Sequence, residues 1–301
     1  MMQDNEETVC GYVAIIGRPN VGKSSLLNRI LTEKLSITSR KPQTTRHRIL
    51  GVKTSGFVQT IYLDTPGMHA KEKHALNRHM NQVARRAMHD VDVVVFMVDA
   101  LKWTDEDEDV FKLVSQLNCP VILAVNKVDT LPEKTVLLPY LQKLSERMNF
   151  LEVIPISVKR KTNIDKLEAV IAHALPKSPH YFPEADLTDR TPRFRVSELI
   201  REKVVRAFGA ELPYTTSIEI EKFELKAVAF IEAIIWVERE GQKPILIGKA
   251  GERLKEVGIR ARLDIEKMLK QKVHLRLWVK VREGWSDDER ALKSLGYLDL
   301  E

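Results

Sequence analysis

Cysteine is almost absent from this sequence. Only Cys10 and Cys119 occur among its 301 residues, which is too few for a disulfide framework and lacks the spacing of metal ligands. Two isolated thiols are typical of a protein that stays in a reducing compartment. We therefore expect both cysteines to be reduced and to have no part in metal binding.

Long apolar runs are missing as well. No stretch approaches the roughly 20 apolar residues that a helix needs to cross a bilayer. The first ten residues, MMQDNEETVC, are acidic and polar, which argues against a signal or transit peptide. These absences argue against an integral membrane protein and predict a cytoplasmic one.

The length and composition of the chain predict a globular protein with two domains. Domains usually hold about 100–200 residues, and this chain has 301, of which 44% are hydrophobic and 30% are charged. The formal net charge is +6. This charge favours an acidic partner such as nucleic acid.

Residues 1–175 alternate between short β-branched runs and amphipathic stretches. The runs predict strands buried on both faces, and the stretches 72–88, 105–117 and 163–174 predict helices between them. This alternation predicts an α/β domain with a mostly parallel sheet and helices on both faces. The predicted strands are YVAIIG, FVQTIYLD, VDVVVFMVD, PVILAVN and EVIPIS.

A second, α+β domain is predicted after a proline-rich linker at 176–193. Residues 194–285 predict the order helix, strand, strand, helix, helix, strand. The last helix of this order, at 252–270, has one apolar face. The last strand, VHLRLWVKV, alternates strictly between apolar and polar residues.

The last segment, 286–301, predicts one more helix. Ser286 and Glu289 have the spacing of a capping box, in which each side chain bonds the backbone of the other residue. Gly296 then fits the position just after the last helical residue, where a left-handed conformation is common. We expect the helix to lie between these signals.

The segment GRPNVGKS, from Gly17 to Ser24, fits the phosphate-binding pattern G-x-x-x-x-G-K-[ST]. It lies between a predicted strand and a helix, where its backbone N–H groups can surround phosphate oxygens. We expect Lys23 to reach the β- and γ-phosphates and the Ser24 hydroxyl to bind Mg²⁺. The residues expected around the phosphates are Gly17, Arg18, Pro19, Asn20, Val21, Gly22, Lys23, Ser24 and Ser25.

The tetrapeptide NKVD follows the apolar strand VILAV and indicates guanine as the base. The carboxylate of Asp129 can accept hydrogen bonds from the N1–H and the exocyclic amine of guanine. Adenine has no such pair of donors, so it would leave this carboxylate desolvated without compensation. We expect Asn126 and Lys127 to brace the loop against the base and the phosphate-binding loop.

The motif DTPG, from Asp64 to Gly67, ends the predicted strand FVQTIYLD. Asp64 is placed to reach Mg²⁺ through a water molecule, and the amide of Gly67 can meet the γ-phosphate. The next residue is Met68, where many GTPases have a glutamine that orients the attacking water, and a thioether cannot do this. The residues expected at the nucleotide are Asp64, Thr65, Pro66, Gly67 and Met68.

With PNVGKSSLLN and PQTTRHR, these motifs make the first domain similar to the Era family of translation-factor-related GTPases. The resemblance implies that Ser157, Val158 and Lys159 form the loop whose backbone meets the guanine. It also implies a first switch segment, in which we favour Thr45 over Thr44 as the residue that completes the Mg²⁺ shell when GTP is bound. The switch residues are Gln43, Thr44, Thr45, Arg46 and His47.

The same resemblance implies a catalytic set and the ions that assist it. Lys23, Thr45, Asp64 and Gly67 are the expected catalytic residues, and Asn20 is expected to help to hold a K⁺ ion. Without a glutamine to position water, we expect slow intrinsic hydrolysis, on the order of 10⁻³ s⁻¹, which a partner or K⁺ accelerates. The expected ligands are GTP or GDP, Mg²⁺ and K⁺.

A second glycine pair, in LIGKAGERLK, lies in the second domain. Its spacing is G-x-x-G, and no serine or threonine follows its lysine to bind Mg²⁺, so it does not predict a second nucleotide site. Its setting resembles a type II KH domain, whose GxxG loop lies against the backbone of single-stranded nucleic acid. The expected RNA contacts are Ile247, Gly248, Lys249, Ala250, Gly251, Arg253, Lys255, Arg260 and Arg262.

The distribution of charge supports this assignment independently. Between Gly248 and Arg282 there are eleven Lys or Arg and four Asp or Glu, which gives a net charge of +7. The whole chain carries +6, so all other residues together carry −1. The basic excess therefore lies in one segment, as a nucleic-acid-binding surface requires.

With ALNRHM and GWSDDERALKSLGYLDLE, the resemblance to the Era family covers nearly the whole chain. It implies a monomeric GTPase that binds single-stranded 16S rRNA near its 3′ end and assists maturation of the 30S ribosomal subunit. Two alternatives remain open. One is an RNA-binding assembly factor that uses nucleotide as a structural ligand, and the other is a GTPase regulator that associates weakly and peripherally with the inner membrane.

Overall fold

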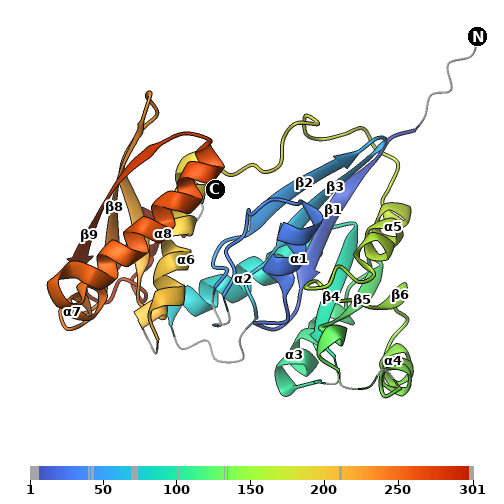
Figure 1. The fold of residues 1–301 in the computed structure, drawn as a ribbon. Coiled ribbons are helices and arrows are strands. Elements are labelled where there is room, and N and C mark those ends of the chain that lie inside the picture. The colour runs from blue at the N-terminus through green and yellow to red at the C-terminus, as the bar shows by residue number, and fades with distance from the viewer. Residues whose placement is uncertain are drawn as a thin grey trace, which may run out of the picture. The chain divides into compact units, whose positions relative to one another are not determined.

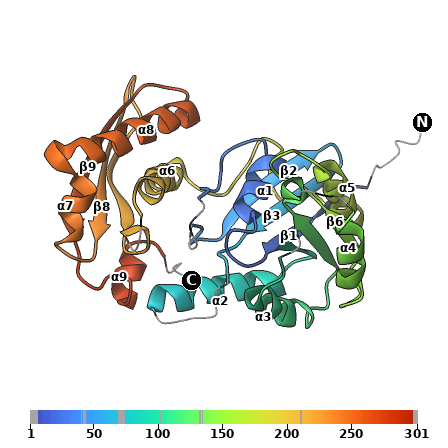
Figure 2. The ribbon, with the colours of Figure 1, turned by 60° about the horizontal axis from the view of Figure 1, so that its bottom comes forward.

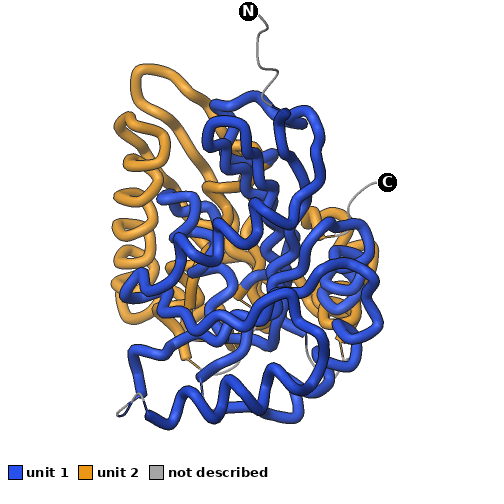
Figure 3. Tube along the Cα trace, turned by 90° about the vertical axis from the view of Figure 1, so that its right-hand side faces the viewer, with its two compact units in different colours: residues 1–36, 45–71, 80–189 blue, residues 37–44, 72–79, 190–301 orange. Residues whose placement is uncertain are grey.

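The computed structural model describes residues 7–39, 41, 44–68, 74–100, 102–131, 133, 135–209 and 212–297 (Figure 1). The chain forms two compact units, which have different colours in Figure 3. Unit 1 contains residues 1–36, 45–71 and 80–189, and unit 2 contains residues 37–44, 72–79 and 190–301. Two short segments from the first half of the sequence therefore pack with the C-terminal residues.

Unit 1 is built on a six-stranded sheet. Its strands are β1 (Val9–Ile16), β2 (Ile49–Ser55), β3 (Val58–Asp64), β4 (Val93–Asp99), β5 (Val121–Asn126) and β6 (Glu152–Pro155). The strand order is β2-β3-β1-β4-β5-β6, and all neighbours are parallel except β2 and β3. The prediction of a mostly parallel sheet is confirmed. The sequence alone does not predict β2, because Gly51 and the polar residues at its end interrupt the apolar pattern.

Helices cover both faces of this sheet, as predicted (Figure 2). Side chains of α2 (Ala75–His89), α3 (Asp105–Val114) and α4 (Leu137–Ser145) share a hydrophobic core with β1, β4 and β5. Helices α1 (Lys23–Ile30) and α5 (Ile164–Ala174) lie on the opposite face. A short 3₁₀ turn, η1 (Val128–Thr130), follows β5.

The proline-rich segment that follows α5 packs against unit 1 as irregular chain. The side chain of Gln59 in β3 accepts hydrogen bonds from the N–H groups of Tyr181 at 2.8 Å and Phe182 at 2.9 Å. The N–H of Val52 in β2 donates to the carbonyl of Leu187 at 2.9 Å. The segment predicted as a linker is therefore hydrogen-bonded to the strands β2 and β3.

Unit 2 contains a three-stranded sheet and the helices that pack on it. Its elements are α6 (Pro192–Ala207), η2 (Leu212–Tyr214), β7 (Ser217–Glu224), β8 (Ala229–Val237), α7 (Gln242–Ile247), η3 (Lys249–Gly251), α8 (Glu252–Leu269), β9 (Val273–Val281) and α9 (Glu289–Ser294). The strand order is β7-β8-β9, with β7 antiparallel and β9 parallel to β8. Helices α6, α7 and α8 share one hydrophobic core with all three strands. The predicted order of helix, strand, strand, helix, helix, strand is confirmed.

Helix α8 and strand β9 have the amphipathic character that their sequences predict. Val257, Ala261 and Ile265 of α8 are at most 1% exposed, and β9 alternates between exposed residues and residues that are at least half-buried. Because α8 has one apolar and one charged face, it is a helix that packs on a protein core. No helix in the described part of the chain is long and apolar enough to cross a membrane.

The predicted capping box of the last helix is wrong. Helix α9 begins at Glu289, and its cap is Asp288, whose side chain accepts a hydrogen bond from the N–H two residues later at 2.8 Å. Ser286 belongs to the preceding turn, where the completely buried Trp285 fixes the chain. The end of the helix agrees with the prediction, since Gly296 follows it with φ +76°.

Candidate nucleotide-binding site

The loop of residues 17–22 joins β1 to α1. Its last residue, Gly22, has φ +111° and precedes the first turn of α1, for which the described residues provide no side-chain cap. A Cβ atom on Gly22 would lie 2.5 Å from Nδ2 of Asn126, so only glycine fits. The uncapped N–H groups and the positive end of the helix dipole form an arrangement that binds phosphate.

Lys23 is buried at the first position of α1. Its Nζ donates to the carbonyl oxygens of Gly17 at 2.8 Å and Arg18 at 2.9 Å. Burial lowers the pKa of Lys23 to about 8, while the charge of Asp64 acts in the opposite direction. A phosphate in the loop would favour the charged form of this lysine.

Two hydroxyls and a carboxylate lie together beside the loop. The Oγ of Ser24 and the Oγ1 of Thr45 are 2.7 Å apart. Asp64 is completely buried, and neither of its carboxylate oxygens has a hydrogen-bond partner among the described residues. Burial raises the pKa of Asp64, against the effects of the Ser24 hydroxyl and of Lys23. Oxygen donors of this kind fit Mg²⁺, which binds hydroxyls, carboxylates and water in octahedral geometry.

The chain that follows Asp64 turns against the phosphate-binding loop. The hydroxyl of Thr65 donates to a carbonyl of β1 at 3.0 Å. A Cβ atom on Gly67 would lie 2.8 Å from Cγ of Pro19, so the two segments are in close contact. Met68 is 9% exposed and packs in the core that α2 and β4 share. Its thioether is therefore a core group, and the expectation that it does not orient water stays a prediction.

Asn126 connects the phosphate-binding loop to the loop at 157–159. Its Nδ2 donates to the carbonyl of Val21 at 2.7 Å, and its Oδ1 accepts from the N–H of Val158 at 3.1 Å. Both contacts are buried, so Asn126 fixes the distance between the two loops. Lys159, at the end of the second loop, is exposed.

Lys127 and Asp129 are each held by a side chain from another strand or loop. Lys127 has φ +66°, and its Nζ contacts Asp99 of β4 at 2.7 Å. One carboxylate oxygen of Asp129 accepts a hydrogen bond from the hydroxyl of Ser157 at 2.5 Å. The Ser157 side chain therefore orients the carboxylate that is expected to bind guanine, a role that the sequence does not reveal.

Several of the predicted residues lie outside this cluster. Asn20 is exposed with φ +64°, and Arg46 is completely buried. Thr44 belongs to unit 2, where its hydroxyl donates to a carbonyl three residues earlier at 2.7 Å. Gln43 lies outside the described residues. Of the two threonines considered for Mg²⁺, Thr45 is thus the one beside Ser24.

The second glycine pair forms a short turn between α7 and α8 in unit 2. Gly248 has φ +75° and ψ 177°, and Ala250 has φ +51°. The N–H of Gly251 donates to the carbonyl of Gly248 at 3.2 Å, which closes the turn. The loop has none of the hydroxyl or carboxylate groups that surround Lys23, so it is a different kind of site.

The cations near this loop differ in their contacts. The side chains of Lys249, Arg253 and Lys255 are exposed and form no hydrogen bond or ion pair with any residue that the structure describes. Arg260 and Arg262 each pair with a glutamate four residues away in α8. Three of the five predicted cations are therefore available to an external anion, and the other two are partly neutralised.

Two parts of the chain match known protein families. The family described as 50S ribosome-binding GTPase matches residues 12–127, and the family described as KH domain matches residues 211–286. The chain is 56% identical to the GTPase Era of Marinobacter nauticus over 298 residues, which cover 99% of this chain and 98% of that protein. The chain belongs to the Era family of GTPases.

Further Era proteins match over the same length. Era of Pseudomonas putida is 58% identical over 300 residues, which cover 99% of each chain. The crystal structure of an Aquifex aeolicus Era variant bound to GDP·AlF₄⁻ has a TM-score of 0.93 and 38% identity, and covers 96% of this chain and 99% of that one. Era in complex with MgGDPNP and nucleotides 1506–1542 of 16S ribosomal RNA has a TM-score of 0.94, with the same identity and coverage. As a member of this family, the chain is a GTPase that binds GTP and GDP, and its C-terminal unit contains a KH domain.

One contact of this Era-family site joins residues that are distant in the sequence. The Nε of Arg18 donates to the carboxylate of Asp107 at 2.8 Å, and Asp107 is completely buried. Asp107 also forms the capping box of α3 with Thr104. The T-x-x-D pattern could have predicted the cap. It could not have predicted the pairing with Arg18, 89 positions earlier, which depends on the order of the strands.

Proposed function

We propose that this Era-family GTPase binds single-stranded RNA near the 3′ end of 16S rRNA and assists maturation of the 30S ribosomal subunit. The observation that carries the proposal is the GxxG loop at the head of a segment with net charge +7, in a chain that also has a guanine-nucleotide site. A relative solved with nucleotides 1506–1542 of 16S rRNA matches 96% of this chain. The protein would act as a monomer in the cytoplasm, where its RNA partner is found.

In the proposed reaction, the residues of unit 1 hold the triphosphate and its ions. Mg²⁺ bound to the β- and γ-phosphates would neutralise the charge that develops during hydrolysis. Ser24 and Thr45 would supply hydroxyl ligands, and Asp64 would hold a metal-bound water. Lys23 would bind the phosphates, and Asn20 would contribute an oxygen to K⁺.

Residues 37–44, which lead into the proposed first switch at 43–47, would connect the nucleotide site to the proposed RNA-binding unit. Residues 37–44 belong to unit 2, where the N–H of Thr38 donates to Glu202 of α6 at 3.1 Å. Thr45 directly follows this segment in the sequence, and its hydroxyl lies beside that of Ser24 in the nucleotide site. A change in Thr45 between the GTP and GDP states would therefore act on a segment that is hydrogen-bonded to α6.

Helix α6 extends this connection to α8. Arg201 donates to the carbonyl of Thr44 at 2.5 Å, and the adjacent Glu202 pairs with Lys203 at 3.0 Å. Lys203 in turn pairs with Asp264 of α8, the helix that follows the GxxG loop. Charged contacts thus run from the switch segment to the helix that we propose binds RNA. We propose that GTP and GDP set different affinities for RNA and that hydrolysis times its release.

The test is the affinity for an RNA with the sequence of nucleotides 1506–1542 of 16S rRNA, measured with GDP, with a non-hydrolysable GTP analogue and without nucleotide. We expect the three affinities to differ, and we expect Lys23→Ala to remove the difference because it weakens the grip on the phosphates. Equal affinities in the three states would contradict the switch. Assembly activity that survives Lys23→Ala would favour the alternative in which nucleotide is only a structural ligand.

Adding lipid vesicles to the same RNA-binding measurement tests the membrane alternative. Vesicles that contain anionic lipid compete with RNA if the basic segment is a lipid-binding surface. We expect no competition, because the apolar face of α8 is buried in the core of unit 2 and cannot enter a bilayer. Displacement of the RNA by vesicles would favour the membrane-surface role.

A further inference from the structure

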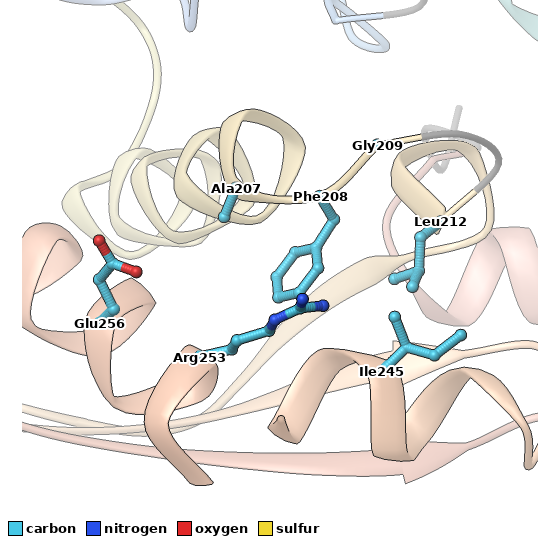
Figure 4. Close-up of a pocket in the computed structure, with 7 residues that line it drawn as sticks. All are labelled: Ala207, Phe208, Gly209, Leu212, Ile245, Arg253 and Glu256. Atoms are coloured by element: carbon cyan, nitrogen blue, oxygen red, sulfur yellow. The ribbon is translucent and has the colours of Figure 1, made fainter. Parts of the chain in front are cut away.

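A pocket in unit 2 lies between the end of α6 and the start of α8 (Figure 4). Two residues of its wall, Phe208 and Leu212, are only 4% and 6% exposed, and Glu256 at its edge already pairs with Arg260 at 2.5 Å. Little of this wall is available to a ligand, so the pocket does not indicate a further binding site. A sharper relationship lies in unit 1, between helix α1 and the loop at 157–159.

The loop at 157–159 belongs to a short turn that backbone hydrogen bonds close. The N–H of Ser157 donates to the carbonyl of Thr162 at 3.1 Å, and the N–H of Thr162 donates to the carbonyl of Ser157 at 3.0 Å. The hydroxyl of Ser157 also accepts a hydrogen bond from the N–H of Arg160 at 3.0 Å. The ends of the turn are thus fixed, and the orientation of the peptide groups inside it depends on their own contacts.

Both backbone polar groups of Val158 contact side chains from other elements. The N–H of Val158 donates to Oδ1 of Asn126 at 3.1 Å, and its carbonyl accepts from Nε of Arg29 at 3.1 Å. Val158 is only 6% exposed, so water is a poor substitute for either partner, and a buried carbonyl without a partner is costly. Arg29 therefore holds a peptide group that solvent cannot readily hold in its place.

The contact with Arg29 determines the direction of the next N–H in the chain. The carbonyl of Val158 and the N–H of Lys159 belong to one peptide group, which is planar and trans, so the two bonds point in opposite directions. Since the carbonyl points to Arg29, the N–H of Lys159 points away from it. This N–H has no acceptor among the residues that the structure describes, and Lys159 is exposed. It is a donor that is available to a ligand.

Helix α1 connects this contact with the phosphate-binding loop. Lys23 is the first residue of the helix, and Arg29 lies six residues later in its last turn. At 1.5 Å per residue, the two are about 9 Å apart along the helix axis. Because the helix is rigid, it sets the distance between the lysine that is expected to bind phosphate and the loop that is expected to meet the base.

We propose that Arg29 is a positioning residue for guanine recognition. It orients the peptide group of Val158 and Lys159 so that the N–H of this group donates to O6 of guanine. Adenine has an amino group in place of O6, and two donors cannot form a hydrogen bond with each other. Asp129 is expected to read the N1–H and the exocyclic amine, so Arg29 controls the remaining polar group on the same edge of the base. The proposal rests on the expected role of the loop at 157–159.

The test compares three variants of the full-length protein. Arg29→Met removes the donor, and Arg29→Gln keeps one, because Nε2 of glutamine is as many bonds from the backbone as Nε of arginine. Methionine, glutamine and arginine have similar helix propensities, and thermal unfolding checks that each variant is folded. The matched control is Arg160→Met. Arg160 is an exposed arginine of the same turn, and its side chain has no hydrogen bond or ion pair with a residue in the described ranges.

Each variant is titrated at pH 7 with GDP, inosine diphosphate and 6-thioguanosine diphosphate, in competition with a fluorescent GDP. Inosine diphosphate lacks the exocyclic amine and keeps O6, whereas the thio analogue has sulfur, a weaker acceptor, in place of O6. We expect Arg29→Met to weaken binding of GDP and inosine diphosphate about fivefold each, as loss of one hydrogen bond does. Binding of the thio analogue should weaken by less than about twofold. Arg29→Gln should recover most of the loss, and Arg160→Met should match the wild type.

A merely structural role of Arg29 predicts a different pattern, because a displaced phosphate-binding loop or a less stable domain weakens all three nucleotides alike. Equal losses for the three nucleotides would therefore overturn the proposal, as would Arg29→Gln binding GDP as weakly as Arg29→Met. If the wild type does not distinguish GDP from the thio analogue, the expected role of the loop at 157–159 fails, and the proposal fails with it. If the wild type distinguishes them and Arg29→Met does so equally well, only the role of Arg29 fails.

Discussion

The hydroxyl oxygens of Ser24 and Thr45 lie 2.7 Å apart, although the two residues are 21 positions apart in the sequence. Mg²⁺ holds its ligands at about 2.1 Å in octahedral geometry, so two adjacent ligands lie about 3 Å from each other. The two hydroxyls therefore have nearly the spacing that neighbouring ligands of one Mg²⁺ need. Asp64, with both carboxylate oxygens buried, completes a set of oxygen donors beside the phosphate-binding loop.

Thr45→Ala removes one of these donors. We expect it to lower the rate of GTP hydrolysis by about 10²-fold, as loss of one group that stabilises a transition state usually does. GDP affinity should change little, because Ser24 remains. The matched control is Thr44→Ala, whose hydroxyl contacts only a carbonyl of its own segment. Hydrolysis rates and GDP affinities of both variants check this, and an equal loss in Thr44→Ala would contradict the assignment.

Met68→Gln introduces the side chain that many GTPases use to orient water. We expect no increase in the rate of hydrolysis, because the side chain of Met68 packs in the hydrophobic core of unit 1. A buried amide without hydrogen-bond partners costs about 1–3 kcal/mol, so the variant should also unfold more easily. The rate of GTP hydrolysis and the temperature of thermal unfolding should be measured for this variant and for Met68→Leu, which serves as the control. Faster hydrolysis in the glutamine variant would show that this position does reach the nucleotide.

Lys23 gives nucleotide binding a dependence on pH. Burial lowers its pKa to about 8, and a bound phosphate raises that pKa again. Above pH 8, binding must therefore take up a proton, so GDP affinity should fall by up to about tenfold per pH unit. Lys23→Arg keeps its charge at these pH values and should show no such fall. Fluorescence titrations with GDP from pH 7 to 9.5 test this, and parallel curves for the two proteins would contradict it.

The same lowered pKa affects the stability of the nucleotide-free protein. Between pH 8 and the ordinary pKa of lysine, near 10.4, the unfolded chain binds more protons at Lys23 than the folded chain does. The contribution of Lys23 to the free energy of unfolding therefore rises with pH in this window. It is constant below pH 8, where both states are protonated.

The parts of the site that the sequence predicts are local. The phosphate-binding loop, the NKVD segment and the GxxG loop each lie within a few residues, and their chemistry follows from backbone geometry and the side chains inside the motif. Gly22 illustrates this, because its positive φ and its place before Lys23 are properties of the loop itself. The fold of both units was predictable for a similar reason, since alternation and helical periodicity are local patterns.

The parts that the sequence does not predict depend on which elements meet in space. The pairing of Arg18 with Asp107 requires the order of β1 and β4 and the position of α3. The grouping of residues 37–44 with unit 2 cannot be predicted from a motif, because the switch motif associates Gln43 and Thr44 with the nucleotide and gives no information about residues 37–42. The capping box at Ser286 failed because the burial of Trp285 determines where the last helix begins.

Arg201 and Glu198 form a buried ion pair within α6, with Nη2 and Oε2 2.7 Å apart. Arg201→Met would leave the Glu198 carboxylate buried without this arginine, which typically costs about 3–5 kcal/mol. The double variant Glu198→Met, Arg201→Met removes both charges and should recover most of that stability. Urea unfolding followed by tryptophan fluorescence can measure the free energy of unfolding of each variant, since Trp236, Trp278 and Trp285 lie in unit 2. A double variant as unstable as the single one would contradict the explanation.

The same pair of variants separates stability from signalling. Both lack the hydrogen bond from Arg201 to the carbonyl of Thr44, so both should bind RNA with an affinity that no longer depends on the nucleotide. Their basal GTP hydrolysis should stay within about twofold of the wild type, because both residues belong to unit 2 and the nucleotide site belongs to unit 1. If the stable double variant still distinguishes GTP from GDP in its RNA affinity, the connection through Thr44 is wrong, and the signal must use another path, such as the hydrogen bond between Thr38 and Glu202.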